Sequence, residues 1–435
     1  MKNSAINLIK SDIAFSIIVS FLFKSFGAVS LFIFTALLTN YLGANKSGSF
    51  FLAFALINFF SVFSRVGLDQ TIIRFTSIAN SQDGQFQIID ILSKAVLVTA
   101  IMSGVCCFLI YFYSDYIAGN VFNNSSLSTI LKNMAPAVIG LSIITIVSMS
   151  FQGLNRLKSS VFIINIALNL ILIIILLNFK GLNEEDFAKL YGFTSLMVAL
   201  ISLVYWVFIL PSRKRLYKNK IDWGIVFSSC MPLWVMMLMA QTIQWSGQLI
   251  AGAWVEPVDI AQLAVAQRTT MVTSFILVAA NLVVAPRFAI LYKKGDITGL
   301  KKIANLSVKL STLFSLPIFI FMLLMPEFFM GIFGRDFVSG GLLLQILVIG
   351  QFFTVVTGSV GYLLTMTGNE REMRNTMLIS APFALIVSLI LVPFYGVIGS
   401  AIATSLALSL QNLLAVWYVN RKLGFNTLTI WRSQK

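Results

Sequence analysis

Histidine is absent from this 435-residue chain, and charged residues of all kinds make up only 11% of it. Without imidazole there is no histidine base, no imidazole metal ligand and no histidine relay to a nucleophile. The three cysteines, Cys106, Cys107 and Cys230, fall inside long apolar runs, where small apolar side chains are a better interpretation than disulfides or zinc ligands. We therefore expect no metal, no cofactor and no enzymatic activity.

Apolar sequence is abundant instead: 58% of the residues are hydrophobic and the mean hydropathy is +0.90. A helix that crosses a bilayer needs about 20 apolar residues, and irregular backbone is not tolerated in contact with lipid. Runs of this kind recur about twelve times, so the sequence predicts an all-α polytopic membrane protein. We place the spans at residues 13–39, 47–68, 88–112, 130–151, 158–179, 188–210, 224–252, 260–286, 303–325, 338–365, 373–393 and 396–419.

The net charge of +15 is unevenly distributed among the loops. If the N-terminus is cytoplasmic, most Lys and Arg residues fall in cytoplasmic loops, as the positive-inside rule requires. The charge is then topological and faces anionic lipid headgroups, and we expect no nucleic-acid partner. Both termini are predicted to be cytoplasmic. Trp206, Trp223 and Trp254 lie near span ends, where we expect interfacial anchors.

The most basic connection, residues 211–223, divides the chain into six spans and six spans. A shift of about 213 residues places Arg74-Phe75 on Arg287-Phe288, and a shift of about 215 places Phe179-Lys180-Gly181 on Phe394-Tyr395-Gly396. Corresponding positions at nearly one spacing indicate an internal duplication. We predict two six-helix lobes, residues 1–210 and 224–435, joined by a cytoplasmic linker and enclosing a central cavity.

Short motifs add a family resemblance. Leu42-Gly43, Gly67-Leu68-Asp69 and Arg74-Phe75 resemble the second-helix signature of polysaccharide flippases, in the superfamily of multidrug, oligosaccharidyl-lipid and polysaccharide exporters. The segments 151–156 and 367–369 are similar to the family's motif after the fourth helix and to its echo in the second half. The resemblance implies an O-antigen or capsule type flippase of the bacterial inner membrane, acting in lipopolysaccharide or capsule biosynthesis. It also allows other polysaccharide-assembly proteins as partners.

Four cations remain inside or at the edge of predicted spans: Lys24, Arg65, Arg268 and Lys309, and we expect Lys309, close to a cytoplasmic loop, to snorkel. A charge at mid-membrane costs about 2.5–3.5 kcal/mol on insertion scales, so such residues face a wet cavity or a partner unless they snorkel. The resemblance implies a cationic cavity built from the first, second and eighth helices. We place Asp69 and the other carboxylates at interfaces, which predicts a positive interior that suits a diphosphate.

Polar stripes offer further candidates for substrate binding. Gln241, Gln244, Trp245 and Gln248 share one face of the seventh span, and Asn58 shares a face of the second span with Arg65. Amides and an aromatic ring suit a sugar, but they serve equally well as interhelical hydrogen-bond partners.

The function predicted first is translocation of an undecaprenyl-diphosphate-linked oligosaccharide from the cytoplasmic to the periplasmic leaflet by alternating access. Two alternatives stay open: an ion-coupled small-molecule exporter, which we expect to need an intramembrane Asp or Glu, and a polytopic enzyme of the same pathway. The identity of the sugar, the coupling ion and the oligomeric state are not encoded in these patterns.

Overall fold

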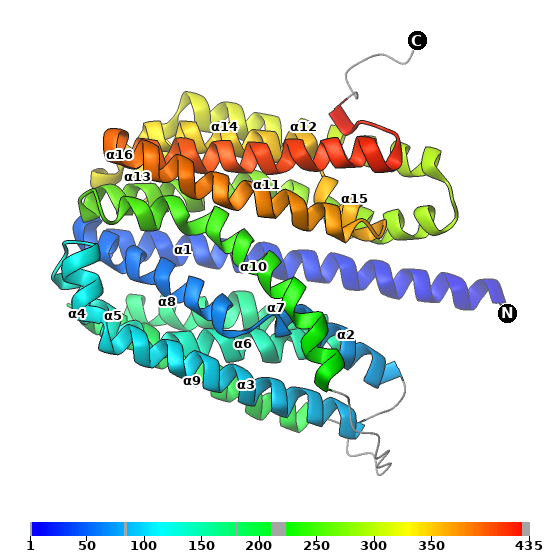
Figure 1. Cartoon of the computed structure of the whole chain (residues 1–435), viewed down its shortest axis with the longest axis horizontal. Coiled ribbons are helices and arrows are strands. Elements are labelled where there is room, and N and C mark those ends of the chain that lie inside the picture. Colours follow the sequence, from blue (N-terminus) through cyan, green and yellow to red (C-terminus); the bar gives the residue numbers. More distant parts are fainter. Residues whose placement is uncertain (1, 82–84, 180, 210–222, 429–435) are drawn as a thin grey trace. The chain divides into compact units, whose positions relative to one another are not determined.

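The computed structural model describes residues 2–81, 85–179, 181–209 and 223–428, and these residues contain helices and no strands (Figure 1). Their contacts form two compact units, Met1–Gln241 and Thr242–Lys435. The predicted linker, 211–223, lies outside the described residues except for Trp223, where α10 begins. The predicted lobe boundaries stay a prediction.

The first unit contains α1 to α9, two π-helical segments and the first part of α10. The bounds are α1 (Lys2–Ser64), α2 (Leu68–Ser81), α3 (Gln85–Phe112), α4 (Ser114–Tyr116), η1 (Ile117–Val121), α5 (Ser126–Met134), α6 (Pro136–Gly153), α7 (Leu157–Phe162), η2 (Ile163–Ala167), α8 (Leu168–Asn178), α9 (Glu184–Ile209) and α10 (Trp223–Ala251).

The second unit contains the rest of α10 and all later helices. The bounds are α11 (Pro257–Lys293), α12 (Ile297–Leu324), α13 (Pro326–Gly331), the 3-10 helix η3 (Arg335–Gly340), α14 (Gly341–Thr357), α15 (Val360–Met366) and α16 (Glu370–Leu423).

Nine helical stretches among the described residues are long and apolar enough to cross a membrane, by length and composition. Two of them include more than one predicted span: Glu370–Leu423 contains the last two, and Leu22–Ser64 covers most of the first two. Both divide at a glycine of positive φ, Gly43 (φ 75°) and Gly396 (φ 54°), which replaces a loop by a sharp bend. With α10 on the seventh predicted span, the helices account for all the predicted spans, and the all-α polytopic membrane fold is confirmed.

α6 lies at the centre of the first unit and packs against α1, α2, α3 and α9. Small residues permit this close packing: a Cβ added to Gly140 of α6 would lie 2.6 Å from the Ser195 carbonyl carbon of α9. Trp206 of α9 is buried and donates from Nε1 to Ser150 Oγ of α6 at 3.1 Å. The expectation that Trp206 is an interfacial anchor is therefore wrong, because its indole N–H has a partner inside the bundle.

The second predicted span continues beyond residue 68 as a broken helix. α1 ends at Ser64 and α2 begins at Leu68, with Val66 at φ 50° and Gly67 at φ 73° between them. The corresponding stretch of the second half, in α11, runs unbroken from Pro257 to Lys293. The two halves thus differ at this point, where the first carries Arg65.

Gly67 provides a test of how α10 packs on this break. A Cβ there would lie 2.3 Å from the Cys230 carbonyl oxygen and 2.8 Å from the Trp234 nitrogen, both of α10. Gly43 has nearly the same φ (75°), but a Cβ there would meet nothing within 4 Å. A positive φ costs a residue with a side chain about 1–3 kcal/mol at either site, but only Gly67→Ala adds a collision with backbone.

We expect Gly67→Ala to lower the unfolding temperature of the detergent-purified protein markedly more than Gly43→Ala does. Thermal unfolding followed by size-exclusion chromatography measures both variants side by side. Equal losses would show that α10 does not press on Gly67.

Candidate functional site

The site is built on the break between α1 and α2. Backbone hydrogen bonds tighten the turn, from Val66 N to Phe63 O at 3.3 Å and from Leu68 N to Arg65 O at 2.9 Å. Trp234 of α10 donates from Nε1 to the same Phe63 carbonyl at 3.0 Å, which satisfies a carbonyl at the end of α1. Broken helices inside a membrane are tolerated where protein covers them or where they line a cavity, and they are frequent at transporter sites.

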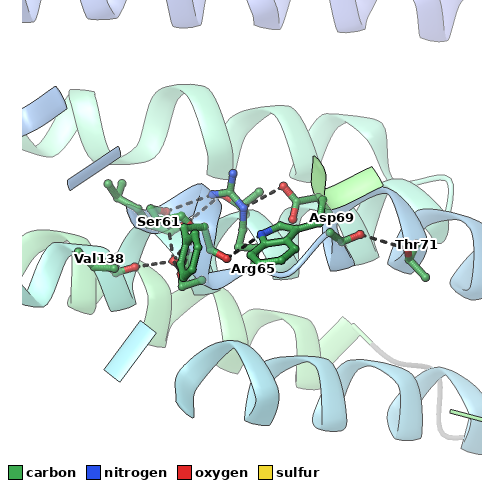
Figure 2. A network of polar contacts seen from close by, with 12 residues as sticks. Ser61, Arg65, Asp69, Thr71 and Val138 are labelled. Carbon is green, nitrogen blue, oxygen red and sulfur yellow. Dashed lines mark hydrogen bonds and ion pairs between the residues drawn. The ribbon is translucent and has the colours of Figure 1, made fainter. Parts of the chain in front are cut away.

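Arg65 and Asp69 form a buried ion pair across this break (Figure 2). Arg65 Nε donates to Asp69 Oδ2 at 2.8 Å, and only 11% and 8% of the two side chains are exposed. Asp69 lies in the first turn of α2, where the positive end of the helix dipole favours a carboxylate. The Asp69 carboxylate is thus stabilised twice, by the Arg65 cation and by the N-terminus of α2.

Hydroxyl groups complete the surroundings of the guanidinium. Arg65 Nη1 donates to Ser61 Oγ at 3.1 Å and to Thr145 Oγ1 of α6 at 3.2 Å. Ser142, one turn earlier on α6, lies 3.1 Å from Ser61 Oγ and 2.9 Å from Ser64 Oγ, with its own hydroxyl donating to Val138 O at 2.6 Å. The network in Figure 2 therefore joins α1, α2 and α6 around one guanidinium.

Asp69 has one carboxylate oxygen to spare. Within the described part of the chain, Asp69 Oδ1 is buried and has no hydrogen-bond partner. A carboxylate oxygen in such a place can take a proton, a cation or a water molecule. The arrangement can hold an anion through Arg65 and its hydroxyls, or a cation through Asp69.

Two sequence-based expectations about this region are wrong. Asp69 is buried inside the bundle, with 5% of the residue exposed, and does not face solvent. Arg65 is paired with Asp69, so its positive charge inside the bundle is compensated by a carboxylate. The interfacial position of Asp69 is predicted from a span that ends at residue 68, whereas the helix continues as α2 to Ser81. The i,i+4 spacing of Arg65 and Asp69 across Gly67 is the pattern that would have identified the pair.

The other predicted site residues lie as follows. Lys24 is exposed on α1, whereas Asn58 is half-buried and donates from Nδ2 to Phe54 O of its own helix at 2.8 Å. Arg268 is half-buried on α11, in the second unit. The predicted convergence of Lys24, Arg65 and Arg268 on one cavity stays a prediction.

The polar stripe of the seventh span lies on α10. Gln241, Gln244 and Trp245 are half-buried and Gln248 is buried, and Gln241 is the last residue of the first unit. A role for this stripe in sugar binding stays a prediction.

Comparison with known proteins places the chain in a family. Residues 13–291 match the family model described as "Polysaccharide biosynthesis protein", and residues 232–391 match the model named MatE. The chain belongs to the polysaccharide biosynthesis protein family. The predicted membership of this branch of the exporter superfamily is confirmed, with the broken second helix and its ion pair inside the matched region.

One relative of this chain is the "probable low-salt glycan biosynthesis flippase Agl15" of Haloferax volcanii. The two sequences are 23% identical, and the alignment covers 94% of this chain and 84% of that protein. Among solved structures, a multidrug resistance MATE family transporter covers 96% of this chain and is itself covered completely, with a TM-score of 0.74 and 11% identity. The lipid II flippase MurJ covers 93% of this chain, 87% of MurJ is covered, and the TM-score is 0.71 at 15% identity. This member of the polysaccharide biosynthesis protein family thus has the same fold as these transporters.

Proposed function

We propose that this protein is a flippase that moves an undecaprenyl-diphosphate-linked oligosaccharide from the cytoplasmic to the periplasmic leaflet of a bacterial inner membrane by alternating access. Both termini are cytoplasmic in this proposal. The observation that carries it is Arg65, a buried guanidinium ringed by Ser61 and Thr145 hydroxyls at a broken helix, in a chain of the polysaccharide biosynthesis family. A guanidinium offers five donors in a planar fork and binds phosphate oxygens in pairs.

In this mechanism Asp69 occupies Arg65 until substrate arrives. A diphosphate carries more charge than one carboxylate and accepts two parallel hydrogen bonds, so it competes with Asp69 for the guanidinium. Lys24 supplies a second positive charge that can meet a phosphate. The oligosaccharide needs no covalent change at any step, and the protein changes only the side from which the headgroup is reached.

The test is flipping in vesicles that contain the purified protein. A short fluorescent oligosaccharide on undecaprenyl diphosphate is placed in both leaflets, and a membrane-impermeant quencher reports the fraction that crosses. We expect Lys24→Ala to slow flipping about tenfold to a hundredfold, the equivalent of one charge-assisted hydrogen bond of about 1.5–3 kcal/mol. Lys24→Arg keeps the charge and should retain part of the rate.

Lys309→Ala is the matched control, because Lys309 is also a lysine on a spanning helix and its side chain is exposed on α12. We expect this variant to flip at nearly the rate of the unmodified protein. Flipping by the unmodified protein no faster than in protein-free vesicles would refute the proposed function, and a fully active Lys24→Ala variant would remove Lys24 from the site.

A second candidate function is an ion-coupled small-molecule exporter, and one observation favours it. Such a transporter is expected to need an intramembrane carboxylate, and Asp69 is buried with one oxygen unpartnered among the described residues. The pairing of Asp69 with Arg65 favours the flippase, because an ion-binding carboxylate is weakened by a cation at 2.8 Å. The two functions differ in their driving force, which is the membrane potential for the flippase and an ion gradient for the exporter.

A further inference from the structure

A long apolar groove runs along the first unit between α9 and the helix formed by α7, η2 and α8. One section of about 500 Å³ is lined by Phe162, Ile163 and Leu170 on one side and by Val198 and Tyr205 on the other. A second section of about 460 Å³ continues it between Ile175 and Phe193. Ile171 of α8 and Ile201 of α9 line both sections, so the two sections adjoin along α8 and α9.

The π-helical segment η2 shapes the wall of this groove. Ile163 and Ala167, its first and last residues, both line the groove. Asn165, in the middle of η2, packs against α1, where a Cβ at Gly27 would lie 2.6 Å from the Asn165 Cβ. π-helical turns inside α-helices are frequent at functional sites, and this one is held against α1 at its centre while its ends face the groove.

The polar groups of the groove gather toward one end, where Lys158, Ser159, Ser202 and Tyr205 line it. Lys158 and Ser159 lie in the first turn of α7 there, and Ser159 Oγ lies 3.3 Å from the Tyr205 hydroxyl across the groove. Phe179, Leu182 and Leu190 line the far end, which is apolar apart from Thr194. A ligand that matches this lining has one anionic head and a long apolar chain.

The length of the groove indicates which kind of lipid chain fits it. Leu190 and Tyr205 line its two ends on α9 and are fifteen positions apart, a rise of about 22 Å at 1.5 Å per residue. One leaflet is only about 15 Å deep, half of a bilayer core of about 30 Å. The groove is therefore longer than the acyl chains of one leaflet, and it suits a chain that reaches into the opposite leaflet.

We propose that this groove binds the polyprenyl chain of the lipid-linked substrate, with its phosphate at the Lys158 end. The proposal rests on the proposed function, because a lipid-linked oligosaccharide brings such a chain. Lys158 lies in the first turn of α7, at the end of its span that is predicted to be cytoplasmic, the side on which the substrate is loaded. Lipid tails are as apolar as the chain itself, so selectivity comes from packing of branched side chains against the chain and from the phosphate, with no net hydrophobic gain.

The test uses undecaprenyl phosphate, which carries the chain and a phosphate but no sugar. The full-length protein in lipid nanodiscs is titrated with this probe, and bound lipid is counted by native mass spectrometry. Ile201→Trp fills the groove at the position shared by both sections, and Leu200→Trp is the control, since the neighbouring Leu200 is 58% exposed outside the lining. We expect Ile201→Trp to weaken binding about tenfold and Leu200→Trp to leave it unchanged.

The head end is tested with a matched pair of lysines on the same unit. Lys158→Gln should weaken binding several-fold, whereas Lys189→Gln should not, because Lys189 is exposed on α9 outside the groove lining. Competition by phosphatidylglycerol at equal concentration, or equal losses in Ile201→Trp and Leu200→Trp, would show an unspecific lipid surface and overturn the proposal.

The outcome is separable from that of the proposed function. Flipping of the lipid-linked oligosaccharide without binding of undecaprenyl phosphate in the groove would refute the groove alone. Binding in the groove without flipping would refute the flippase and leave a site for polyprenyl phosphate.

Discussion

Asp69→Ala is expected to destabilise the protein by about 3–5 kcal/mol, the cost of leaving one partner of a buried ion pair without its counter-charge. Asp90→Ala is the matched control. Asp90 and Lys94 form an i,i+4 pair with the same 2.8 Å separation as Arg65 and Asp69, but 44% of the Lys94 side chain is exposed. Solvent screens such a pair, so its loss should cost about 0–1 kcal/mol. Thermal unfolding in detergent compares the two variants.

The double variant Arg65→Met, Asp69→Leu separates stability from transport. Replacing both charges by apolar side chains of similar size removes the unpaired charge, so we expect most of the lost stability to return. Flipping should stay at the level of protein-free vesicles, since the guanidinium is gone. A double variant that flips at the normal rate would show that the pair is structural only, and one as unstable as Asp69→Ala would show that packing, and not charge, explains the loss.

Flipping should accelerate when the vesicle interior that corresponds to the cytoplasm is made negative. An anionic diphosphate that moves outward gains about 2.3 kcal/mol per charge per 100 mV if its charge crosses the full field uncompensated. Because Arg65 and Asp69 carry opposite charges, a joint movement of the pair displaces no net charge. Movement of Lys24 or of a co-transported cation with the headgroup would cancel the displaced charge.

The measurement applies a potassium diffusion potential at equal pH and equal sodium on both sides, and the initial rate is compared with that at zero potential. Reversal of the potential should slow flipping and serves as the internal control. Voltage-independent flipping that requires a proton or sodium gradient would contradict this prediction and favour the ion-coupled exporter, with Asp69 as the ion site. Asp69→Asn should then abolish the gradient dependence.

Much of the fold follows from the sequence because span length and apolar composition are local properties. All the predicted spans have helices, including those joined at Gly43 and Gly396, where the chain bends within a few residues. The extension of the second span was missed because α2 carries Asp69, Gln70 and Arg74, and this polar content hides a helix that packs inside the bundle. Helices of that kind are recognised by their neighbours and not by their hydropathy.

The candidate site was predicted only in part for a similar reason. Arg65 stands out as a cation in an apolar run, but its partners come from elsewhere: Thr145 is 80 positions away and Trp234 is 171 positions from Phe63. No periodic pattern relates these positions. A serine or threonine on a spanning helix is also common, so Ser142 and Thr145 carry no distinguishing mark until α6 is placed beside α1.

α6 holds together the two helices on either side of the break between α1 and α2. On one side Ser142 ties α6 to Ser61 and Ser64 of α1, and on the other Ser77 of α2 donates to Gly153 O at 3.2 Å. A Cβ at Gly153 would lie 2.7 Å from Thr76 Cβ, so α2 and α6 are in backbone-close contact. Because α1 and α2 are both hydrogen-bonded to α6, the break between them is a fixed bend and not a hinge. We expect a movement that carries substrate across to displace α1, α2 and α6 together, with the backbone that holds Arg65 unchanged while its side chain exchanges partners.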